Sequence, residues 1–334
     1  MRRAVALLPL MALAGCDGWQ SALAPHGPQA ERSFGLFQLF LAVSAVVWLL
    51  VVLGLALALW HRRTSLPGPP LALDERAEKR GERIVTGLAV LTAAILVVLT
   101  IASYLTGRGL AAMQGTEALT IRVTGHQWWW EVTYEDPSPH RVLGTANEIV
   151  IPVGRPIRLK LQSTDVIHSL WVPNLFGKRD LITGHTTDIH FRADAPGEYR
   201  GQCAEFCGAQ HAHMALLIRA RPAEEFEAWR EAQLKPADPP QDETRQRGLQ
   251  VLLTGPCVMC HRVRGTLAGG SVAPDLTHLA SRSTLAAGTL PLTRGTLAAW
   301  ITDPQAIKPG ANMPQIKLPP EDFQALLSYL EGLR

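Results

Sequence analysis

Two long segments near the start of the chain are apolar on every side. Residues 34–60 and 84–105 consist almost wholly of apolar side chains. At a rise of ~1.5 Å per residue, either segment can cross a hydrocarbon core of ~30 Å as a helix. A helix in a soluble core rarely stays apolar on all its faces for this length. We therefore predict a two-helix transmembrane hairpin over residues 34–106.

The loop that joins these segments is basic and predicts the orientation of the hairpin. Its basic residues are Arg62, Arg63, Arg76, Lys79, Arg80 and Arg83. Loops rich in Lys and Arg stay in the cytoplasm. We therefore expect a multi-pass protein of a bacterial plasma membrane, with both chain ends and the later domains on the periplasmic side.

From about residue 117 the pattern changes to alternation of apolar and polar positions. Such segments, separated by Gly, Pro and Asp turns, are 119–134, 148–163, 187–194 and 213–220. Alternation of period two is typical of half-buried strands. Residues 115–222 are therefore predicted to form an all-β domain, a sandwich or small barrel.

The rest of the chain has a helical pattern. Residues 223–244 combine a short helix with a proline-rich stretch, "KPADPPQDE", which reads as a semi-rigid linker. Residues 245–334 form a third predicted domain and end in an amphipathic helix. The apolar stripe of that helix consists of Phe323, Leu326, Leu327 and Leu330.

Composition and charge narrow the class of partner. The 334 residues exceed one compact domain, which agrees with several units. Charged residues make up 18% of the chain, and the net charge is only +3. The sequence has no basic block of the kind that marks nucleic-acid binding, so no nucleic-acid partner is expected.

The N-terminal residues "MRRAVALLPLMALAGC" have the form of a secretory signal, with a basic start, an apolar stretch and small residues. The end of this segment, "LAGC", resembles a bacterial lipobox. The resemblance implies that residues 1–15 are removed and that Cys16 becomes an acylated N-terminus. A plain signal peptide with an incidental cysteine is the alternative.

A second cysteine-rich segment, "GQCAEFCGAQHAHM", has the chemistry of a copper site. It holds Cys203, Cys207, His211 and Met214. Structural zinc sites usually need a second cysteine pair, which this domain lacks, and a thioether favours copper. A blue-copper site would use a single cysteine. Two neighbouring thiolates can instead bridge two copper ions.

Each copper ion of such a pair needs an imidazole. His211 offers one, and His213 competes with it because it adjoins Met214. The other must come from upstream, where "STDVIHSLWVP" contains His168. Taken alone, His168 could equally be a half-buried histidine with no ligand role.

Three segments resemble subunit II of haem–copper cytochrome c oxidases: "VTGHQWWWEVTYED", "DVIHSLWVPNLFGKRDLITGHT" and "PGEYRGQCAEFCGAQHAHM". The resemblance extends over about residues 34–220. It implies a cupredoxin-like Greek-key barrel that holds a dinuclear copper-A centre. The implied ligands are the bridging Cys203 and Cys207, the imidazoles of His168 and His211, Met214, and the backbone carbonyl of Glu205.

The same resemblance implies further roles. The side chain of Glu205 would bind a magnesium ion shared with subunit I, and Trp128 would receive the electron from cytochrome c. If the "WWW" run lies on one strand, Trp128 and Trp130 share a face and Trp129 takes the other. Glu82 is a candidate for the mouth of a proton path into subunit I, or simply an acid at a helix start.

The sequence also departs from the family pattern. Thr183 and His185 stand in "DLITGH" where the family has proline and arginine, which puts any contact of that arginine in doubt. Val85 replaces a tryptophan that the family often has near Glu82.

The motif "CVMCH" predicts covalent attachment of haem c. Cys257 and Cys260 would form the thioethers, and His261 would be the proximal iron ligand. A thioredoxin-like pair is disfavoured because no βαβ pattern surrounds it. Met313, in "KPGANMP", is the predicted sixth ligand, and the terminal helix makes the domain similar to a class I cytochrome c.

Together these features predict the electron-transfer subunit of a terminal oxidase, without the oxygen-reducing site. Electrons would pass from haem c to copper A and then to subunit I, where oxygen reduction is coupled to proton pumping. Expected partners are subunits I and III, an external donor such as cytochrome c, and membrane lipid. The alternative is the corresponding subunit of a copper-A nitric oxide reductase.

Overall fold

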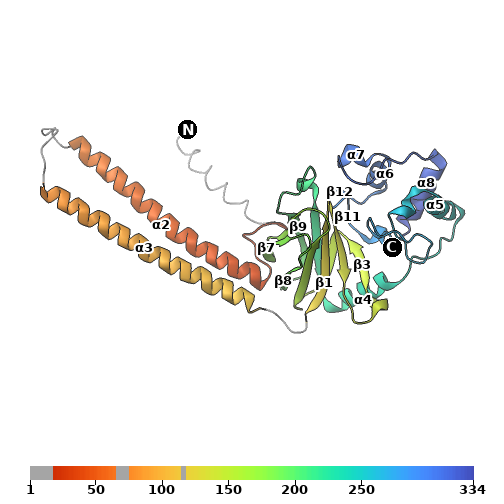
Figure 1. Ribbon diagram of the computed structural model, residues 1–334, viewed down its shortest axis with the longest axis horizontal. Helices are drawn as coiled ribbons and strands as arrows, with labels where there is room; N and C mark the ends of the chain where they lie inside the picture. The colour runs from red at the N-terminus through yellow and green to blue at the C-terminus, as the bar shows by residue number, and fades with distance from the viewer. Residues whose placement is uncertain (1–17, 65–74, 114–117) are drawn as a thin grey trace, which may run out of the picture. The chain divides into compact units, whose positions relative to one another are not determined.

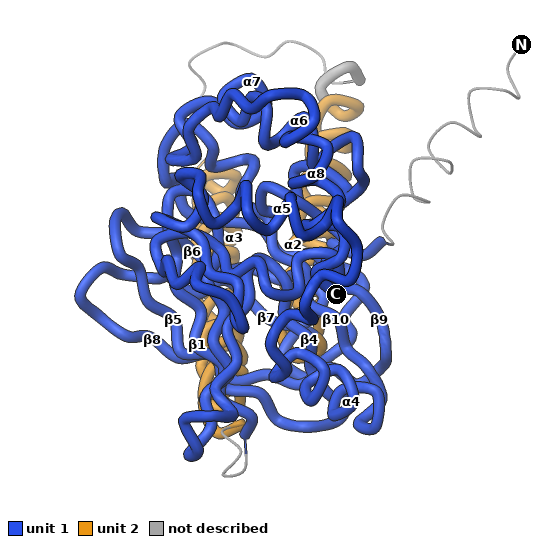
Figure 2. Tube along the Cα trace, turned by 90° about the vertical axis from the view of Figure 1, so that its right-hand side faces the viewer, with its two compact units in different colours: residues 1–30, 114–334 blue, residues 31–113 orange. Residues whose placement is uncertain are grey.

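The computed structural model describes residues 18–64, 75–113 and 118–334. Residues 31–113 form one compact unit, and residues 1–30 with 114–334 form the other (Figure 2). The predicted signal peptide and Cys16 lie outside the described residues, so both the peptide and the lipid anchor stay predictions.

The smaller unit consists of two long helices, α2 (Pro28–Thr64) and α3 (Glu75–Ala111), which run side by side (Figure 1). Both are longer than the apolar segments that predicted them. Large apolar side chains such as Trp48, Leu50 and Val97 are more than half exposed. Such an apolar surface suits lipid rather than water, and both helices are long enough to span a membrane.

The all-β domain is a sandwich of two five-stranded sheets. The first sheet has the order β3-β2-β1-β5-β8 and the second the order β4-β10-β9-β6-β7. The strands are β1 (Leu119–His126), β2 (Trp129–Tyr134), β3 (Leu143–Ala146), β4 (Glu148–Pro152), β5 (Ile157–Ser163), β6 (His168–Val172), β7 (Phe176–Leu181), β8 (Thr187–Phe191), β9 (Gly197–Cys203) and β10 (Ala215–Arg221).

Alternating burial on these strands produces the core. Every second residue of β1 and β5 is buried, including Ile121, Val123, Leu159 and Leu161. These residues pack with apolar side chains from the second sheet in one cluster. The expected all-β, cupredoxin-like domain is therefore confirmed.

The tryptophan run does not lie on a single strand, which corrects one expectation. β1 ends at His126, and β2 pairs with it antiparallel from Trp129 onward, so Gln127 and Trp128 form the connecting turn. Trp130 is fully buried, whereas the indole of Trp129 stacks on the His126 ring with centroids 4.5 Å apart. Trp128 therefore belongs to neither strand, and the alternation of buried and exposed side chains along a strand does not apply to it.

The C-terminal domain follows a short helix and the predicted linker. Arg264 donates to the backbone oxygens of Gln233 and Leu234, at the end of the helix that precedes the linker, so the linker is held against the domain. The helices are α4 (Ala223–Leu234), α5 (Glu243–Thr254), α6 (Arg294–Thr302), α7 (Pro304–Ile307) and α8 (Pro320–Glu331), and a small hairpin consists of β11 (Thr284–Leu285) and β12 (Leu290–Pro291).

The first and last helices of this domain, α5 and α8, cross closely. A Cβ atom at Gly248 of α5 would lie 2.1 Å from the backbone oxygen of Ala325 in α8. Glycine therefore allows the two backbones to approach. The predicted apolar stripe of α8 is buried at Leu326, Leu327 and Leu330, which agrees with a helical cytochrome c domain.

Candidate metal and haem sites

The cysteine-rich segment forms the connection between two antiparallel strands. β9 ends at Cys203, and β10 begins directly after Met214. The backbone N–H of Cys203 donates to the carbonyl of Met214 at 2.9 Å, which closes the loop at its base. Neighbouring β6 begins at His168, and its Leu170 pairs with Cys203. The sheet therefore brings His168 to a loop more than thirty residues later in the chain.

The predicted copper ligands converge at this point. The Sγ atoms of Cys203 and Cys207 are 3.7 Å apart. His168 Nδ1 lies 3.9 Å from Cys203 Sγ, and His211 Nδ1 lies 3.6 Å from Cys207 Sγ. Met214 Sδ is 4.0 Å from Cys207 Sγ, and the carbonyl oxygen of Glu205 is 3.3 Å from Cys203 Sγ.

This donor set fits copper. Two thiolates, two imidazole nitrogens, a thioether and a carbonyl oxygen form the soft, sulfur-rich environment that copper prefers. Cys203, Cys207 and Met214 are buried, and His168 is fully buried, so the donors are shielded from water. Ser169, which follows His168, accepts a hydrogen bond from the backbone of Ala204 and helps to fix the loop.

His211, rather than His213, approaches the thiols. His213 is exposed, and its Nδ1 lies 2.8 Å from the side-chain oxygen of Gln210. Both histidines belong to one 3-10 turn (His211–His213), which sends their rings in different directions. Of the two histidines that the sequence offered, the geometry of the loop thus favours His211 as the ligand.

Asp165 orients His168 and was not singled out from the sequence. Its Oδ1 lies 2.8 Å from His168 Nε2, so the Nδ1 atom is directed toward Cys203. Outer partners of this kind fix the ring of a metal-ligating histidine. Burial opposes the charged imidazole, but hydrogen bonds with Cys203 and Asp165 outweigh it and raise the pKa of His168.

The two neighbouring thiols shift each other's pKa in opposite directions. The hydrogen bond between the two sulfur atoms lowers the pKa of Cys203 to about 3, against the effect of burial. The same hydrogen bond, together with burial, raises the pKa of the Cys207 thiol above its ordinary value. Because the thiolate is the form that binds metal, copper competes with a proton for Cys207.

Trp128 lies against residues 203–214, the segment that we call the copper loop. Its Nε1 donates to the carbonyl oxygen of Cys207 at 2.9 Å, and the side chain of Gln127 donates to the same oxygen at 2.8 Å. The indole is partly buried and packs on the core of the β domain. A hydrogen bond thus joins the predicted electron acceptor to the backbone of a predicted copper ligand.

The remaining predicted residues have mixed surroundings. The Glu205 carboxylate pairs with Lys178 at 3.1 Å, at the surface of the copper loop. Thr183, where the family has proline, donates to the backbone oxygen of Asp165 at 2.6 Å and so supports the loop before His168. His185 is exposed, and Glu82 is an exposed residue of α3. The proton-path role of Glu82 stays a prediction.

The haem motif has the arrangement expected of an attachment site. Cys257 lies in a 3-10 turn (Pro256–Met259), and Cys260 follows directly. His261 Nδ1 lies 2.8 Å from the carbonyl oxygen of Pro274, which leaves Nε2 for iron. Burial lowers the pKa of His261 and favours the neutral ring that binds metals.

The predicted sixth ligand, Met313, packs against the apolar core of the same domain. Two other candidates have less suitable surroundings. Met259 is 70% exposed. Both ring nitrogens of His278 lie near backbone oxygens, of Arg334 at 2.7 Å and of Lys235 at 3.0 Å. The surroundings therefore favour Met313, which stays a prediction.

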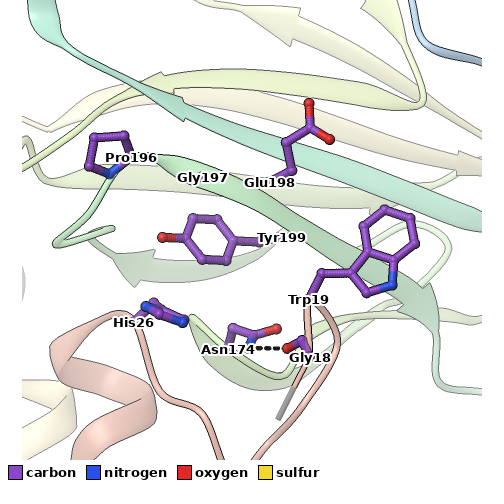
Figure 3. Close-up of a pocket in the computed structure, with 8 residues that line it drawn as sticks. All are labelled: Gly18, Trp19, His26, Asn174, Pro196, Gly197, Glu198 and Tyr199. Carbon is purple, nitrogen blue, oxygen red and sulfur yellow. Dashed lines mark hydrogen bonds between the residues drawn. The ribbon is translucent and has the colours of Figure 1, made fainter.

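A surface pocket elsewhere on the β domain contains none of these residues. It is lined by Gly18, Trp19, His26, Asn174, Pro196, Gly197, Glu198 and Tyr199 (Figure 3). The first described residues cross it and are fixed by backbone hydrogen bonds, including one from His26 to Asn174 and one from Arg200 to Trp19. This pocket therefore belongs to the packing of the N-terminal segment, not to the redox sites.

Comparisons with known proteins agree with both halves of this description. Residues 136–221 match the family described as "Cytochrome C oxidase subunit II, periplasmic domain", and residues 246–334 match "Cytochrome c". The cytochrome c oxidase subunit 2 of Alkalihalophilus pseudofirmus is 33% identical over 335 residues, covering 96% of this chain and 94% of that protein.

Other relatives are more distant. The cytochrome c oxidase subunit 2 of Bacillus subtilis is 28% identical, covering 99% of this chain and 96% of that protein. A solved periplasmic domain of subunit II of cytochrome oxidase from Bradyrhizobium japonicum is 33% identical, with a TM-score of 0.34; it covers 36% of this chain and 96% of that one. The relative from Alkalihalophilus pseudofirmus matches this chain along nearly its whole length, and two family models match its later domains. The chain therefore belongs to the cytochrome c oxidase subunit 2 family and carries a cytochrome c domain at its C-terminal end.

Proposed function

We propose that this chain accepts electrons at its cytochrome c domain and delivers them through its copper loop to subunit I of the oxidase, where oxygen is reduced to water and protons are pumped. When bound, haem c and dinuclear copper A supply one-electron carriers. One observation carries the proposal: the haem motif at Cys257–His261 and the cluster of His168, Cys203 and Cys207 belong to one chain and one compact unit.

The residues of the copper loop have separate tasks in this proposal. Cys203 and Cys207 would hold both metals, and His168 and His211 would each bind one of them. Met214 and the carbonyl of Glu205 complete the set. Asp165 holds the ring of His168, and a fixed geometry limits the reorganisation that accompanies each change of charge.

The cytochrome c domain is proposed to be the point where electrons enter. Cys257 and Cys260 attach the haem, His261 and Met313 bind its iron, and Trp128 connects this domain to the copper loop. A tethered donor acts at roughly millimolar effective concentration, so the internal transfer does not depend on diffusion.

This proposal is tested in the purified complex by reduction with an external cytochrome c. We expect the haem c absorbance to change before the copper-A absorbance. A Cys257→Ser, Cys260→Ser variant without haem should lose reduction by cytochrome c, while a small reducing dye still reduces copper A. Reduction of copper A before haem c, or at an unchanged rate in the haem-free variant, would refute the proposed order.

The anchoring of the chain is part of the same proposal. We propose that both apolar helices cross the plasma membrane, with the two redox domains on the periplasmic side and an acylated Cys16. Mass spectrometry of the mature chain should then find Cys16 at the N-terminus with acyl groups. Cys16→Ser should impair processing more than membrane retention, because the helices already anchor the chain. A mature terminus several residues later would exclude the lipid.

We also propose that the Glu205 side chain contributes to a magnesium site shared with subunit I. The carboxylate pairs with Lys178 at 3.1 Å in this structure, so a magnesium ion would compete with that lysine for it. Glu205→Gln should lower the magnesium content of the purified complex. An unchanged magnesium content would exclude this role.

A further inference from the structure

A buried lysine joins the cytochrome c domain to the copper loop. Lys308 follows α7 and is only 3% exposed. Its Nζ donates to the backbone oxygens of Trp128 at 2.7 Å, His213 at 2.8 Å and Ala286 at 2.9 Å. The first two acceptors belong to the β domain and the third to the cytochrome c domain. A lysine ammonium has three protons, so all of them have partners here.

Burial of an ammonium group costs free energy unless hydrogen bonds compensate. Burial lowers the pKa of Lys308 to about 7, and the negative charge of Cys207 opposes this shift. The three carbonyl acceptors suit the protonated form, because only that form has three protons to donate. A lysine in a loose contact between two surfaces would keep its ammonium group in water, whereas that of Lys308 is buried. The arrangement instead requires the two domains to be in one fixed position, because two of the acceptors come from the other domain.

The residues after Lys308 extend this contact onto the indole of Trp128. The carbonyl oxygen of Pro309 accepts from the side chain of Gln210 at 2.8 Å. Gly310 has a φ of +87°, and a Cβ atom there would lie 3.4 Å from Cη2 of Trp128. The absence of a side chain allows the loop to lie directly on the edge of the ring.

The same loop leads to the predicted sixth haem ligand. The side chain of Gln305 accepts from the backbone N–H of Gly310 at 2.8 Å and donates to the carbonyl oxygen of Met313 at 3.1 Å. Residues 305–313 are thus held as one piece. This piece carries Met313 at one end and the contact with Trp128 in its middle.

A second contact fixes the orientation of the domain. The Glu148 carboxylate of the β domain accepts from the backbone and the hydroxyl of Ser283, at 2.7 and 2.9 Å. The N–H of Ala215 donates to the carbonyl of Ala287 at 2.9 Å. Ala286 and Ala287 have φ values of 51° and 59°, a strained conformation for alanine that persists only where the surroundings impose it.

We propose that Lys308 is a positioning residue that holds the cytochrome c domain over Trp128. Trp128 is then covered by the resident domain, so an external donor delivers electrons to haem c and has no direct access to the copper loop. The inference rests on the proposed function for the direction of transfer, but the docking itself follows from contacts within one compact unit.

The test uses the complete oxidase with Lys308→Met, which keeps the length of the side chain and removes its charge and donors. Hydroxyl-radical footprinting with mass spectrometry reports the solvent access of Trp128. We expect the oxidation rate of Trp128 to rise, and the rate of electron transfer from haem c to copper A to fall, each by at least about tenfold. A tenfold change corresponds to ~1.4 kcal/mol, less than the loss of one strong charge-assisted hydrogen bond.

Matched variants separate docking from folding. Lys317→Met removes an exposed lysine of the same domain and should change neither readout. Gly310→Asn inserts a side chain against Trp128 with a residue that tolerates positive φ, and it should act like Lys308→Met. The haem and copper spectra should stay as in the parent in all three variants.

The outcomes distinguish this inference from the proposed function. A parent enzyme that passes electrons from haem c to copper A, with unchanged footprints and rates in Lys308→Met, would overturn the role of Lys308. A parent enzyme in which haem c does not reduce copper A would overturn the proposed function instead. If Lys308→Met fails to assemble, Gly310→Asn alone decides between these results.

Discussion

Cys207→Ser should abolish the dinuclear copper centre and leave the haem attached. The Sγ atom of Cys207 lies 3.7 Å from that of Cys203, 3.6 Å from His211 Nδ1 and 4.0 Å from Met214 Sδ. It therefore contacts the other thiolate as well as an imidazole and a thioether. A serine hydroxyl stays protonated and is a poor ligand for soft copper, so only the Cys203 thiolate would remain to hold two ions.

The expected result is a copper-to-haem ratio of at most half that of the parent. Metal analysis and the haem absorbance of one sample give this ratio. Oxygen consumption supported by cytochrome c should fall to background, because electrons no longer leave the subunit. Ala209→Ser places a hydroxyl in an exposed position of the same loop and should keep the full copper content. A copper content in Cys207→Ser equal to that of the parent would contradict the bridging role.

Met313→Ala should change the chemistry of the haem without releasing it. Cys257, Cys260 and His261 remain, so the haem stays covalently attached. A thioether on the iron raises the reduction potential and closes the sixth position. We expect the potential to fall on the order of 100 mV, a modest part of the ~0.8 V range that axial ligands span. The open position should also bind carbon monoxide.

Redox titration and the carbon monoxide difference spectrum measure these effects. Met259→Ala is the matched control, because Met259 is 70% exposed and adjoins the attachment cysteines. It should leave the potential unchanged. A parent-like potential in Met313→Ala, with a shift in Met259→Ala or in a His278 variant, would assign the sixth ligand elsewhere. Reduction of copper A by a small dye should be normal in every case.

Most of the predicted copper site can be recognised from the spacing of residues in one short segment of the sequence. Cys203, Cys207, His211 and Met214 lie within twelve residues, so the chemistry of copper could be predicted from the segment alone. His168 could not, since a single histidine in an apolar stretch is more often an ordinary core residue. Only the pairing of β6 with β9 brings it to the thiols, and that pairing depends on the whole sheet.

Features that depend on tertiary contacts escaped prediction. The turn at Gln127 and Trp128 lacks the glycine, proline or asparagine that usually marks a hairpin, so the sequence pattern predicts one continuous strand through the tryptophan run. Lys308 stands before a proline and a glycine, and nothing in this segment of the sequence indicates its burial. Its burial results from contacts with residues 180 and 95 positions away in the chain, at Trp128 and His213.

Asp165 illustrates a signal that the sequence did contain. It precedes His168 by three residues, a spacing at which a carboxylate can reach the outer nitrogen of the ring. The strands and the amphipathic terminal helix were predictable because their periodicity repeats over many residues. Individual hydrogen-bond partners were not, because they depend on how the elements pack.

Electron spin resonance of the oxidised, fully copper-loaded chain tests the central claim most directly. Two copper ions held by the thiolates of Cys203 and Cys207, as proposed, would share one unpaired electron. We therefore expect a hyperfine pattern that arises from two equivalent copper nuclei, in a sample that also contains the attached haem. A pattern from a single copper nucleus, in a sample whose copper content is complete, would contradict the dinuclear centre and with it the proposed route of electrons through this subunit.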